Sequence, residues 1–548
     1  MTLFNETLNG NKESKNISSS RNGKLNNLSV ISRAEEIQGW LIDKLAEVLE
    51  IEPNQIDVQQ DFEEYGLESA EAINLSGDLE DYLSCRLPPT LLWDYQNIEA
   101  LAQYLATSNL PQNQINSANE LDLSSSSTIV DLSSNLDKNH QPEIPSENYK
   151  FEEFPEYKKL LAQQQQVLNL GNGNPFFVTQ ETVVNDRTTV DGRELINFAT
   201  YNYIGMCGDP TVTQAAQKAI ELYGTSACAS RLISGEKPIH RKLERELADF
   251  IGVEDSIVMV GGHATNVTTI GHLFGKNDLV IYDSLSHNSI LQGCFLSGAS
   301  LVAFPHNDAD ALEAILSDRR HRYQRVLIVI EGVYSTDGDI ADLPQFIKLK
   351  QKYKTFLMVD EAHSMGTIGQ SGRGISEYFN INPQDIDLWM GTLSKSFASC
   401  GGYIAGSHAL IEYLKYTAPG FVFSVGMSPP NAAATLAAIQ VLKAEPERAT
   451  ILQARAKLFL KLAQENNLDT GMSNDSPVVP IIVGDSLKSI QLSQNLFKQG
   501  INVPFMIYPS VPQHGARLRF FITCNHSEEQ ISFTVDTLTK ELNKLNDL

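Results

Sequence analysis

Apolar and polar positions along the first fifth of the chain follow a helical pattern. Apolar residues recur every three or four positions in a segment that contains Ile37 and Leu41, and the same spacing returns over residues 70–83 and 98–105. Each of these segments therefore has an apolar stripe that must be buried against a neighbour. The pattern predicts three or four helices that form a small bundle over residues 33–107.

Two stretches of low apolar content flank this bundle. Residues 1–32 are rich in Asn, Ser and Lys, and residues 108–150 contain four consecutive serines, repeated Asn and Gln, and the prolines Pro142 and Pro145. Such compositions bury too little apolar surface to offset the loss of conformational entropy. We predict a disordered tail and a flexible linker, and a linker of about 40 residues spans on the order of 35 Å.

From residue 151 onward the pattern is that of an α/β protein. Short apolar runs at 256–260, 279–283, 326–331 and 356–361 alternate with helical stretches and glycine-bearing loops. This alternation predicts a mainly parallel sheet with helices on both faces. Residues 441–548 follow as a helix and an α+β segment, which we expect to form a smaller C-terminal subdomain.

Composition narrows the classes of function. The net charge of −25 argues against a nucleic-acid role through a general basic surface. Six cysteines without a C-x-x-C pair favour reduced thiols, and no metal site is predicted. We find no secretory signal and no run of about 20 apolar residues, so we expect a cytoplasmic protein without a membrane span.

Ser69 is the candidate modification site of the N-terminal bundle. It follows a Gly-Leu turn at the start of an acidic helical segment, where it would either act as a helix N-cap or present a hydroxyl for modification. Residues 33–107 resemble acyl and peptidyl carrier domains, in which the serine of a Gly-Leu-Asp-Ser-Leu signature carries phosphopantetheine. Here Glu68 and Ala70 replace the Asp and the Leu of that signature. The segment holds 17 acidic and 3 basic residues, and such a face typically docks on basic partner enzymes.

Four pieces of the long α/β region together suggest a cofactor site. Lys395 lies between small polar residues before a Gly-Gly pair, and by itself it could be an ordinary loop lysine. Asp360 ends an apolar run with His363 close behind it, an arrangement that could hold a protonated pyridine nitrogen. His287 lies in a polar loop and is either a surface histidine or a ring-stacking group. A fourth piece, VGGHATN at 260–266, predicts a strand-to-helix turn that could cradle a phosphate.

In order and spacing these pieces resemble the α-oxoamine synthases, a family of pyridoxal-phosphate (PLP) enzymes of fold type I. The family contains aminooxononanoate synthase, 5-aminolevulinate synthase and serine palmitoyltransferase. The resemblance runs over essentially all of 151–548. It also rests on the following segments: NFATYNYIG (197–205), ASRLISGEKPIHRKLE (229–244), HND (306–308), EGVYSTDGD (331–339) and YPSVPQHGARLR (508–519).

The resemblance implies a role for each matching residue. Lys395 would form the Schiff base and remove the substrate's α-proton, Asp360 would pair with the pyridine nitrogen, and His363 would bind the ring hydroxyl. His287 would stack on the ring. The remaining expected contacts are Gly262, His263 and Thr392 for the phosphate, Ser424 for the phosphate of a neighbouring subunit, Glu331, Ser335 and Asn202 for the pocket, and Arg519, with Arg517 as the fallback, for the amino-acid carboxylate.

The implied activity is a PLP-dependent decarboxylative condensation of an amino acid with an acyl thioester, which yields an α-aminoketone. We expect the thioester to be carried on Ser69, within a polyketide-like secondary pathway, in a homodimer served by a phosphopantetheinyl transferase and an acyl-loading enzyme. Two alternatives stay open: an acyl-coenzyme A-dependent synthase of the sphingoid or biotin pathway, and a non-catalytic scaffold. Ile507 stands where the aminooxononanoate enzymes have arginine, which weakens the biotin alternative.

Overall fold

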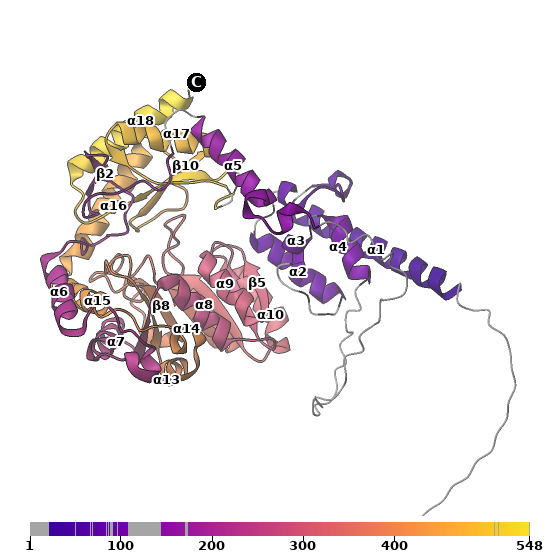
Figure 1. The fold of residues 1–548 in the computed structure, drawn as a ribbon, viewed down its shortest axis with the longest axis horizontal. Coiled ribbons are helices and arrows are strands. Elements are labelled where there is room, and N and C mark those ends of the chain that lie inside the picture. Colours follow the sequence, from indigo (N-terminus) through magenta and orange to yellow (C-terminus); the bar gives the residue numbers. More distant parts are fainter. Residues whose placement is uncertain are drawn as a thin grey trace, which may run out of the picture. The chain divides into compact units, whose positions relative to one another are not determined.

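The computed structural model describes residues 21–49, 51–65, 67, 69–83, 85, 87, 91–95, 97–107, 144–169, 174–508, 510–512 and 514–546. The chain divides into two compact units, Met1–Asn116 and Ser117–Leu548. Each unit is described by itself (Figure 1). Within the part of the chain that the structure describes, every helix is too short or too polar to traverse a lipid bilayer.

The N-terminal unit is a helical bundle. Its elements are α1 (Arg21–Val48), the short 3₁₀ turns η1 (Pro53–Gln55) and η2 (Phe62–Tyr65), α2 (Ser69–Leu83), α3 (Leu91–Asp94) and α4 (Ile98–Thr107). Leu41, Leu79 and Leu101 are buried together in its core, because the apolar stripes of the helices face one another.

The predicted N-terminal tail needs a correction. Helix α1 begins at Arg21, so residues 21–32 are helical and do not belong to the predicted disordered tail. Leu25 and Leu28 continue the helical spacing upstream, and the Asn- and Ser-rich composition obscured it. Residues 1–20 and most of the predicted linker lie outside the described residues.

A seven-stranded sheet forms the centre of the second unit. The strand order is β3-β9-β8-β7-β6-β4-β5. Strand β9 pairs antiparallel with β3 and with β8, and all other pairs of neighbouring strands are parallel. The strands are β3 (Asp255–Met259), β4 (Leu279–Asp283), β5 (Ser300–Phe304), β6 (Val326–Glu331), β7 (Phe356–Asp360), β8 (Leu388–Thr392) and β9 (Gly402–Gly406). The mainly parallel sheet predicted from the apolar runs is confirmed.

Helices pack against this sheet: α7 and α13 contact β3, α8 contacts β9, α10 contacts β5 and α11 contacts β7. The helical elements of this region are α6 (Pro210–Tyr223), η5 (Arg231–Gly235), α7 (Pro238–Ile251), α8 (Gly262–Leu273), α9 (Asn288–Ser297), α10 (Ala309–Arg319), η6 (Arg320–Arg322), α11 (Leu343–Tyr353), α12 (Ile375–Tyr378), η7 (Pro383–Asp385), α13 (His408–Thr417), α14 (Pro419–Val422) and α15 (Pro429–Ala444).

A smaller region contains two three-stranded sheets, of order β1-β2-β11 and β10-β13-β12. Its strands are β1 (Arg187–Val190), β2 (Arg193–Asn197), β10 (Val478–Gly484), β11 (Ile501–Asn502), β12 (Phe505–Met506) and β13 (Ala516–Phe521). Helices α16 (Glu447–Glu465), α17 (Ser486–Lys498) and α18 (Glu528–Asn546) gather around β10 in Figure 1. Strand β2 pairs with β11, so residues that precede the large sheet contribute to this C-terminal region. Upstream lie η3 (Ser146–Asn148), η4 (Phe151–Glu153) and α5 (Pro155–Leu168).

Candidate active site

The site forms where neighbouring strands of the large sheet end. Glu331, Asp360 and Thr392 are the last residues of β6, β7 and β8, and these three strands are adjacent and parallel. Their carboxyl ends therefore meet at one edge of the sheet, which is where ligands bind in open α/β folds. The register pairs Glu331 directly with Asp360.

Lys395 lies in the loop between β8 and β9 and is held by His363. The distance from Lys395 Nζ to His363 Nε2 is 2.7 Å, and the Tyr203 hydroxyl lies 2.8 Å from the other ring nitrogen, Nδ1. The ammonium group of Lys395 also lies 5.5 Å from the ring centroid of Tyr201. Two aromatic residues from the NFATYNYIG segment thus complete the surroundings of the lysine.

Burial sets the charge state of this pair. Desolvation lowers the pKa of Lys395 to about 8, although the Asp360 and Glu331 carboxyls act in the opposite direction. Burial also holds the pKa of His363 well below its ordinary value, helped by the positive charges of Lys395 and Arg519. His363 is therefore a neutral imidazole near pH 7, and a sizeable fraction of Lys395 is a neutral amine near pH 8.

Asp360 is buried and oriented by two donors. The backbone N–H of Ala362 donates to Oδ1 and the side chain of Asn266 donates to Oδ2, both at 2.9 Å. Two donors fix the plane of the carboxyl, which suits an acid that must receive a pyridinium N–H.

His287 caps helix α9, and its backbone ties it to the strand ends. Its N–H donates to Glu331 Oε1 at 2.5 Å, and its ring nitrogen Nδ1 lies 2.8 Å from Ser289 Oγ. Partial desolvation of the ring lowers the pKa of His287, whereas the charge of Asp360 raises it. Glu331 is fully buried beside a second carboxyl, and both factors raise its pKa well above the ordinary value.

The start of helix α8 fits a phosphate group. Its N-cap residue, Gly261, offers no side-chain cap, so the first N–H groups of a twelve-residue helix have no side-chain acceptor. A Cβ added at Gly262 would lie 2.7 Å from Thr392 Oγ1, so only glycine lets the helix start approach β8 this closely. His263 is exposed at the same turn. These features, together with the buried acid and lysine, fit PLP.

Arg517 and Arg519 lie on the same strand but have different partners. Arg517 is buried in an ion pair with Asp337, at 2.5 Å. Arg519 donates to the carbonyl of Ser335 at 2.8 Å and to the Tyr201 hydroxyl at 3.3 Å. Among the described residues, the buried Nε of Arg519 has no partner. Arg519 therefore retains a donor for a substrate carboxylate, whereas Arg517 is already neutralised.

Two predicted site residues, Asn202 and Ser424, make hydrogen bonds elsewhere and none to Lys395 among the described residues. The side chain of Asn202 donates to the carbonyl of Val184 and accepts from the N–H of Cys207, so it stabilises its own loop. The Ser424 hydroxyl contacts only the neighbouring Val425 carbonyl among the described residues, which leaves its expected role across a subunit boundary as a prediction.

The structure also adds residues that the sequence did not single out. Tyr201, Tyr203, Asn266 and Ser289 contact the predicted site residues directly. Tyr201 and Tyr203 lie in the NFATYNYIG segment, and Asn266 follows Gly262 by one helical turn. Residues four apart share a helix face, so the spacing from Gly262 could have predicted that Asn266 lies near the phosphate turn.

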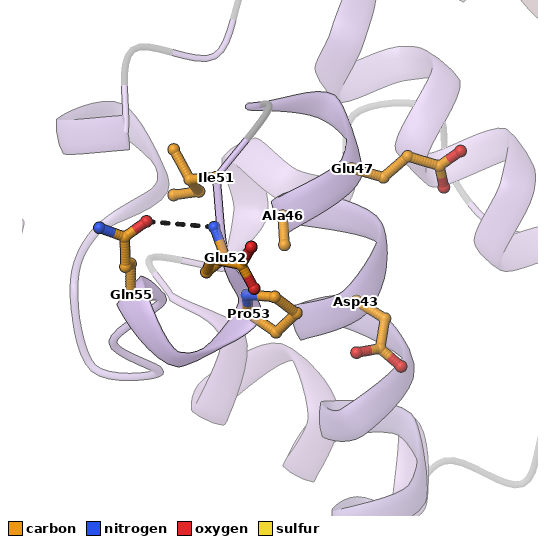
Figure 2. A pocket seen from close by; sticks show the side chains of 7 residues that line it. All are labelled: Asp43, Ala46, Glu47, Ile51, Glu52, Pro53 and Gln55. Carbon is orange, nitrogen blue, oxygen red and sulfur yellow. Dashed lines mark hydrogen bonds between the residues drawn. The ribbon is translucent and has the colours of Figure 1, made fainter.

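In the N-terminal unit, Ser69 is the first residue of α2, as predicted, and its side chain lies outside the described residues. A shallow acidic hollow lies elsewhere on this unit (Figure 2). It is lined by Asp43, Ala46, Glu47, Ile51, Glu52, Pro53 and Gln55.

Comparisons with known proteins agree with this geometry. Residues 193–538 match the family of class I and II aminotransferases, and residues 39–105 match the phosphopantetheine attachment site. The chain is 38% identical over 360 residues to an 8-amino-7-oxononanoate synthase of Thermoanaerobacter pseudethanolicus, covering 66% of this chain and 91% of that protein. It is also 38% identical over 360 residues to serine palmitoyltransferase 3 of Caenorhabditis elegans, covering 63% and 70%.

A solved structure of Sphingomonas wittichii serine palmitoyltransferase is similar with a TM-score of 0.69 and 29% identity, covering 72% of this chain and 99% of that one. The fold is thus that of a PLP-dependent transferase of fold type I. The chain belongs to the class I and II aminotransferase family, in its α-oxoamine synthase branch, and carries a phosphopantetheine attachment domain in front of the catalytic region. It is a PLP-dependent acyltransferase, and its cofactors are PLP and phosphopantetheine.

Proposed function

We propose that this chain joins the α-carbon of an amino acid to the acyl group of a thioester held by its own carrier domain, with loss of CO₂. A carbon–carbon bond replaces the carbon–sulfur bond of the thioester, the carrier thiol leaves with a proton, and the product is an α-aminoketone. The observation that carries this proposal is the presence, in one chain, of a phosphopantetheine domain and a half-buried lysine of lowered pKa among groups that fit PLP.

Lys395 is assigned the proton transfers. PLP, when bound, supplies an electron sink for the substrate's α-carbon. Lys395 would hold the cofactor's aldehyde until the amino acid displaces it, and its freed amine would then take the α-proton. A neutral amine is required for this step, and burial of Lys395 favours that form.

Arg519 and His287 are assigned to the two substrates. Arg519 has a buried N–H without a partner among the described residues, which supports a charge-assisted bond to the amino-acid carboxylate. His287 would donate a hydrogen bond to the thioester carbonyl and polarise it. The two groups lie close enough for the charge of Arg519 to lower the pKa of His287.

The carrier domain is assigned the delivery of the acyl group. Phosphopantetheine on Ser69 would keep the thioester tethered, at a local concentration of roughly the millimolar range. We place the reaction in a polyketide-like secondary pathway, with loading by a separate acyl-transferring enzyme after modification by a phosphopantetheinyl transferase.

Ser69→Ala tests this assignment. We expect wild type to gain the mass of one phosphopantetheine on treatment with a phosphopantetheinyl transferase, and Ser69→Ala to gain none and to lose turnover of carrier-bound donors. Ser76→Ala, a buried position on the same helix, is the matched control and should behave as wild type. Turnover of the carrier-loaded donor by Ser69→Ala would refute the proposal.

A second candidate function is favoured by the relatives. These relatives are named 8-amino-7-oxononanoate synthase and serine palmitoyltransferase, and the similarity covers 66% and 63% of this chain. If Ser69→Ala and wild type used acyl-coenzyme A equally well and the loaded carrier gave no product, the chain would be an acyl-coenzyme A-dependent synthase.

We also propose that two copies of the chain pair through the segment that carries Ser424. On either side of Ser424, Phe423 is 87% exposed and Val425 is 48% exposed, and Ile233 of η5 is 81% exposed. Helix α14, which ends just before Phe423, contacts η5. Exposed apolar side chains on neighbouring elements are typical of a surface covered by a partner. A cytoplasmic location stays a prediction that cell fractionation would test.

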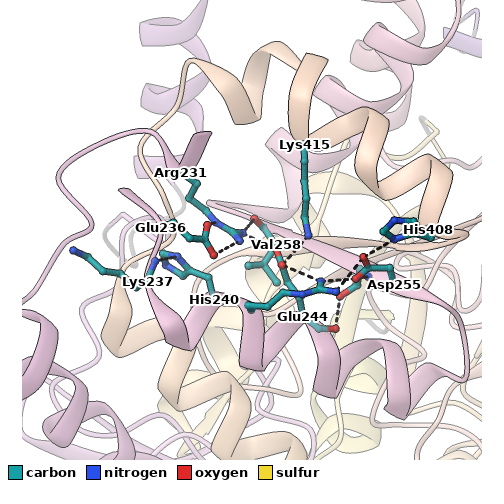
Figure 3. A network of polar contacts seen from close by, with 11 residues as sticks. Arg231, Glu236, Lys237, His240, Glu244, Asp255, Val258, His408 and Lys415 are labelled. Carbon is teal, nitrogen blue, oxygen red and sulfur yellow. Dashed lines mark hydrogen bonds and ion pairs between the residues drawn. The ribbon is translucent and has the colours of Figure 1, made fainter. Parts of the chain in front are cut away.

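A buried ion network holds this face in shape (Figure 3). Arg231 bonds to Glu244 and Glu236, both at 2.6 Å, and its guanidinium lies 5.2 Å from the ring centroid of Phe421. Lys415 adds a further bond to Glu244 at 3.0 Å. The network therefore fixes η5 against α14. Phe423→Asp should convert a dimer to a monomer in analytical ultracentrifugation, and an unchanged mass would contradict the pairing.

A further inference from the structure

One side-chain amide connects the two sides of the candidate site. Asn266, on helix α8, is buried and places Nδ2 2.9 Å from Asp360 Oδ2 and 2.9 Å from Ser289 Oγ. An amide nitrogen carries two hydrogens and can only donate, so both acceptors are identified without ambiguity. Asn266 thus links Asp360, the acid assigned to the pyridine nitrogen, to the loop that carries His287.

The same bonds determine which nitrogen of His287 carries hydrogen. The backbone N–H of Ser289 lies 3.2 Å from His287 Nδ1. A backbone N–H can only donate a hydrogen bond, so Nδ1 must accept it. Ser289 Oγ accepts from Asn266, so its own hydrogen is free to point at His287 Nδ1, 2.8 Å away. Nδ1 therefore accepts, and the hydrogen of the neutral ring lies on Nε2.

We propose that Asn266 and Ser289 are positioning residues that lock His287 as an Nε2–H donor for the carbonyl of the acyl thioester, and that Asn266 also orients the Asp360 carboxyl toward the place of the cofactor. This inference rests on the proposed condensation and deepens it. Neither residue need touch a substrate, since Ser289 acts through the ring of His287, and Asn266 acts through Ser289 and the carboxyl of Asp360.

The charges around His287 are compatible with this lock. Burial is the largest influence and lowers the pKa of His287, Asp360 raises it, and Lys395, His263 and Arg519 lower it. Protonation of Nδ1 would also place a new N–H against the fixed N–H of Ser289. The ring consequently stays neutral and keeps its donor on Nε2, which is the form that can polarise a carbonyl.

The first test is nitrogen NMR of histidine-labelled full-length protein, free of cofactor, with His287→Gln to assign the signal. In wild type, Nδ1 of His287 should be unprotonated and Nε2 protonated at neutral pH. Ser289→Ala removes the hydroxyl donor and should move this signal toward a mixture of forms. Asn266→Ala removes the amide donor that orients Ser289 Oγ, so the hydroxyl hydrogen is no longer directed at the ring and the same shift is expected.

A second readout separates positioning from general damage. In both variants the rate of acyl transfer from a phosphopantetheine thioester should fall about tenfold, the value of one hydrogen bond, while the absorbance change on amino-acid binding persists. Thr269→Val is the matched control, because this buried hydroxyl on the same helix has no partner among the described residues. It should leave both readouts at wild-type values.

The outcomes distinguish this inference from the proposed function. A wild-type Nδ1–H form, or variants whose His287 signal matches wild type, would overturn the lock even if condensation is confirmed. A locked His287 in a wild-type enzyme that condenses no thioester would overturn the condensation instead.

Discussion

Lys395 and His363 form a 2.7 Å contact between Nζ and Nε2, and His363 in turn lies 2.8 Å from the hydroxyl of Tyr203. Tyr203 and His363 are buried, Lys395 is half-buried, and the pKa of Lys395 is lowered to about 8. The proposed catalytic lysine, Lys395, thus contacts the neutral ring of His363. The orientation of this ring depends on Tyr203, which lies 160 positions away in sequence.

Tyr203→Phe should destabilise the fold. The change leaves His363 Nδ1 buried without its partner, which costs about 1–3 kcal/mol. Tyr282→Phe is the matched control, because the Tyr282 hydroxyl is buried with no partner among the described residues, so its loss should cost less. Urea unfolding of both variants measures the difference, and equal losses would contradict the assigned contact.

Lys395 should react with amine reagents at an unusually low pH. In cofactor-free protein its labelling should rise with pH and reach half its maximum near pH 8, because only the neutral amine reacts and burial lowers its pKa to about 8. Peptide mass spectrometry after reductive methylation measures this profile. An exposed lysine such as Lys457 serves as the internal control, and identical profiles for the two lysines would refute the lowered pKa.

Arg519→Ala and Arg517→Ala should fail in different ways. Loss of Arg519 should raise KM for the amino acid about 10- to 100-fold with little change in stability, since it removes a charge-assisted bond to substrate. Loss of Arg517 should instead destabilise the fold by about 3–5 kcal/mol, because it leaves the Asp337 carboxylate buried and unpaired. Steady-state kinetics and urea unfolding separate the two, and reversed phenotypes would exchange their roles.

These two arginines also show where sequence reasoning reaches its limit. The apolar runs predicted β3, β4, β6 and β7, and helical spacing predicted α2 and α4, since such patterns are local. Arg517 and Arg519 are two apart on one strand and share a face, so no local pattern separates them. What separates them is Asp337, which lies 180 positions away in sequence.

Contacts between residues far apart in sequence also explain why the other positioning residues were not predicted. Asn266 meets Asp360 across 94 positions, and β2 pairs with β11 across about 300. Lys395 and Asp360 could be predicted from the sequence because each lies in a recognisable local motif. The residues that orient them carry ordinary side chains, and only the fold brings these side chains together.

Because of His306, the free energy of unfolding should decrease as the pH rises into the alkaline range. Burial lowers the pKa of His306, but the hydrogen bonds that its two ring nitrogens donate to Asp283 and Asp339, at 2.8 and 2.9 Å, outweigh this and raise the pKa to about 10. A histidine whose pKa is raised by folding contributes its full stabilisation below about pH 6.5, the ordinary histidine pKa. This contribution is lost as the pH rises through about 10.

The difference in unfolding free energy between wild type and His306→Gln tests this dependence. It should be on the order of 4 kcal/mol near pH 6 and shrink steadily toward pH 10. Urea unfolding at several pH values measures it, and a difference that does not vary with pH would mean that His306 carries no charge in the folded protein.

The most direct test of the account is to locate the lysine that binds PLP. Borohydride reduction of the purified, yellow full-length protein should fix the cofactor covalently, and peptide mass spectrometry should find the added mass on the peptide that contains Lys395. Lys395→Ala should show neither the visible absorbance nor the modified peptide. Cofactor mass on another lysine, or retained absorbance and turnover in Lys395→Ala, would contradict the account.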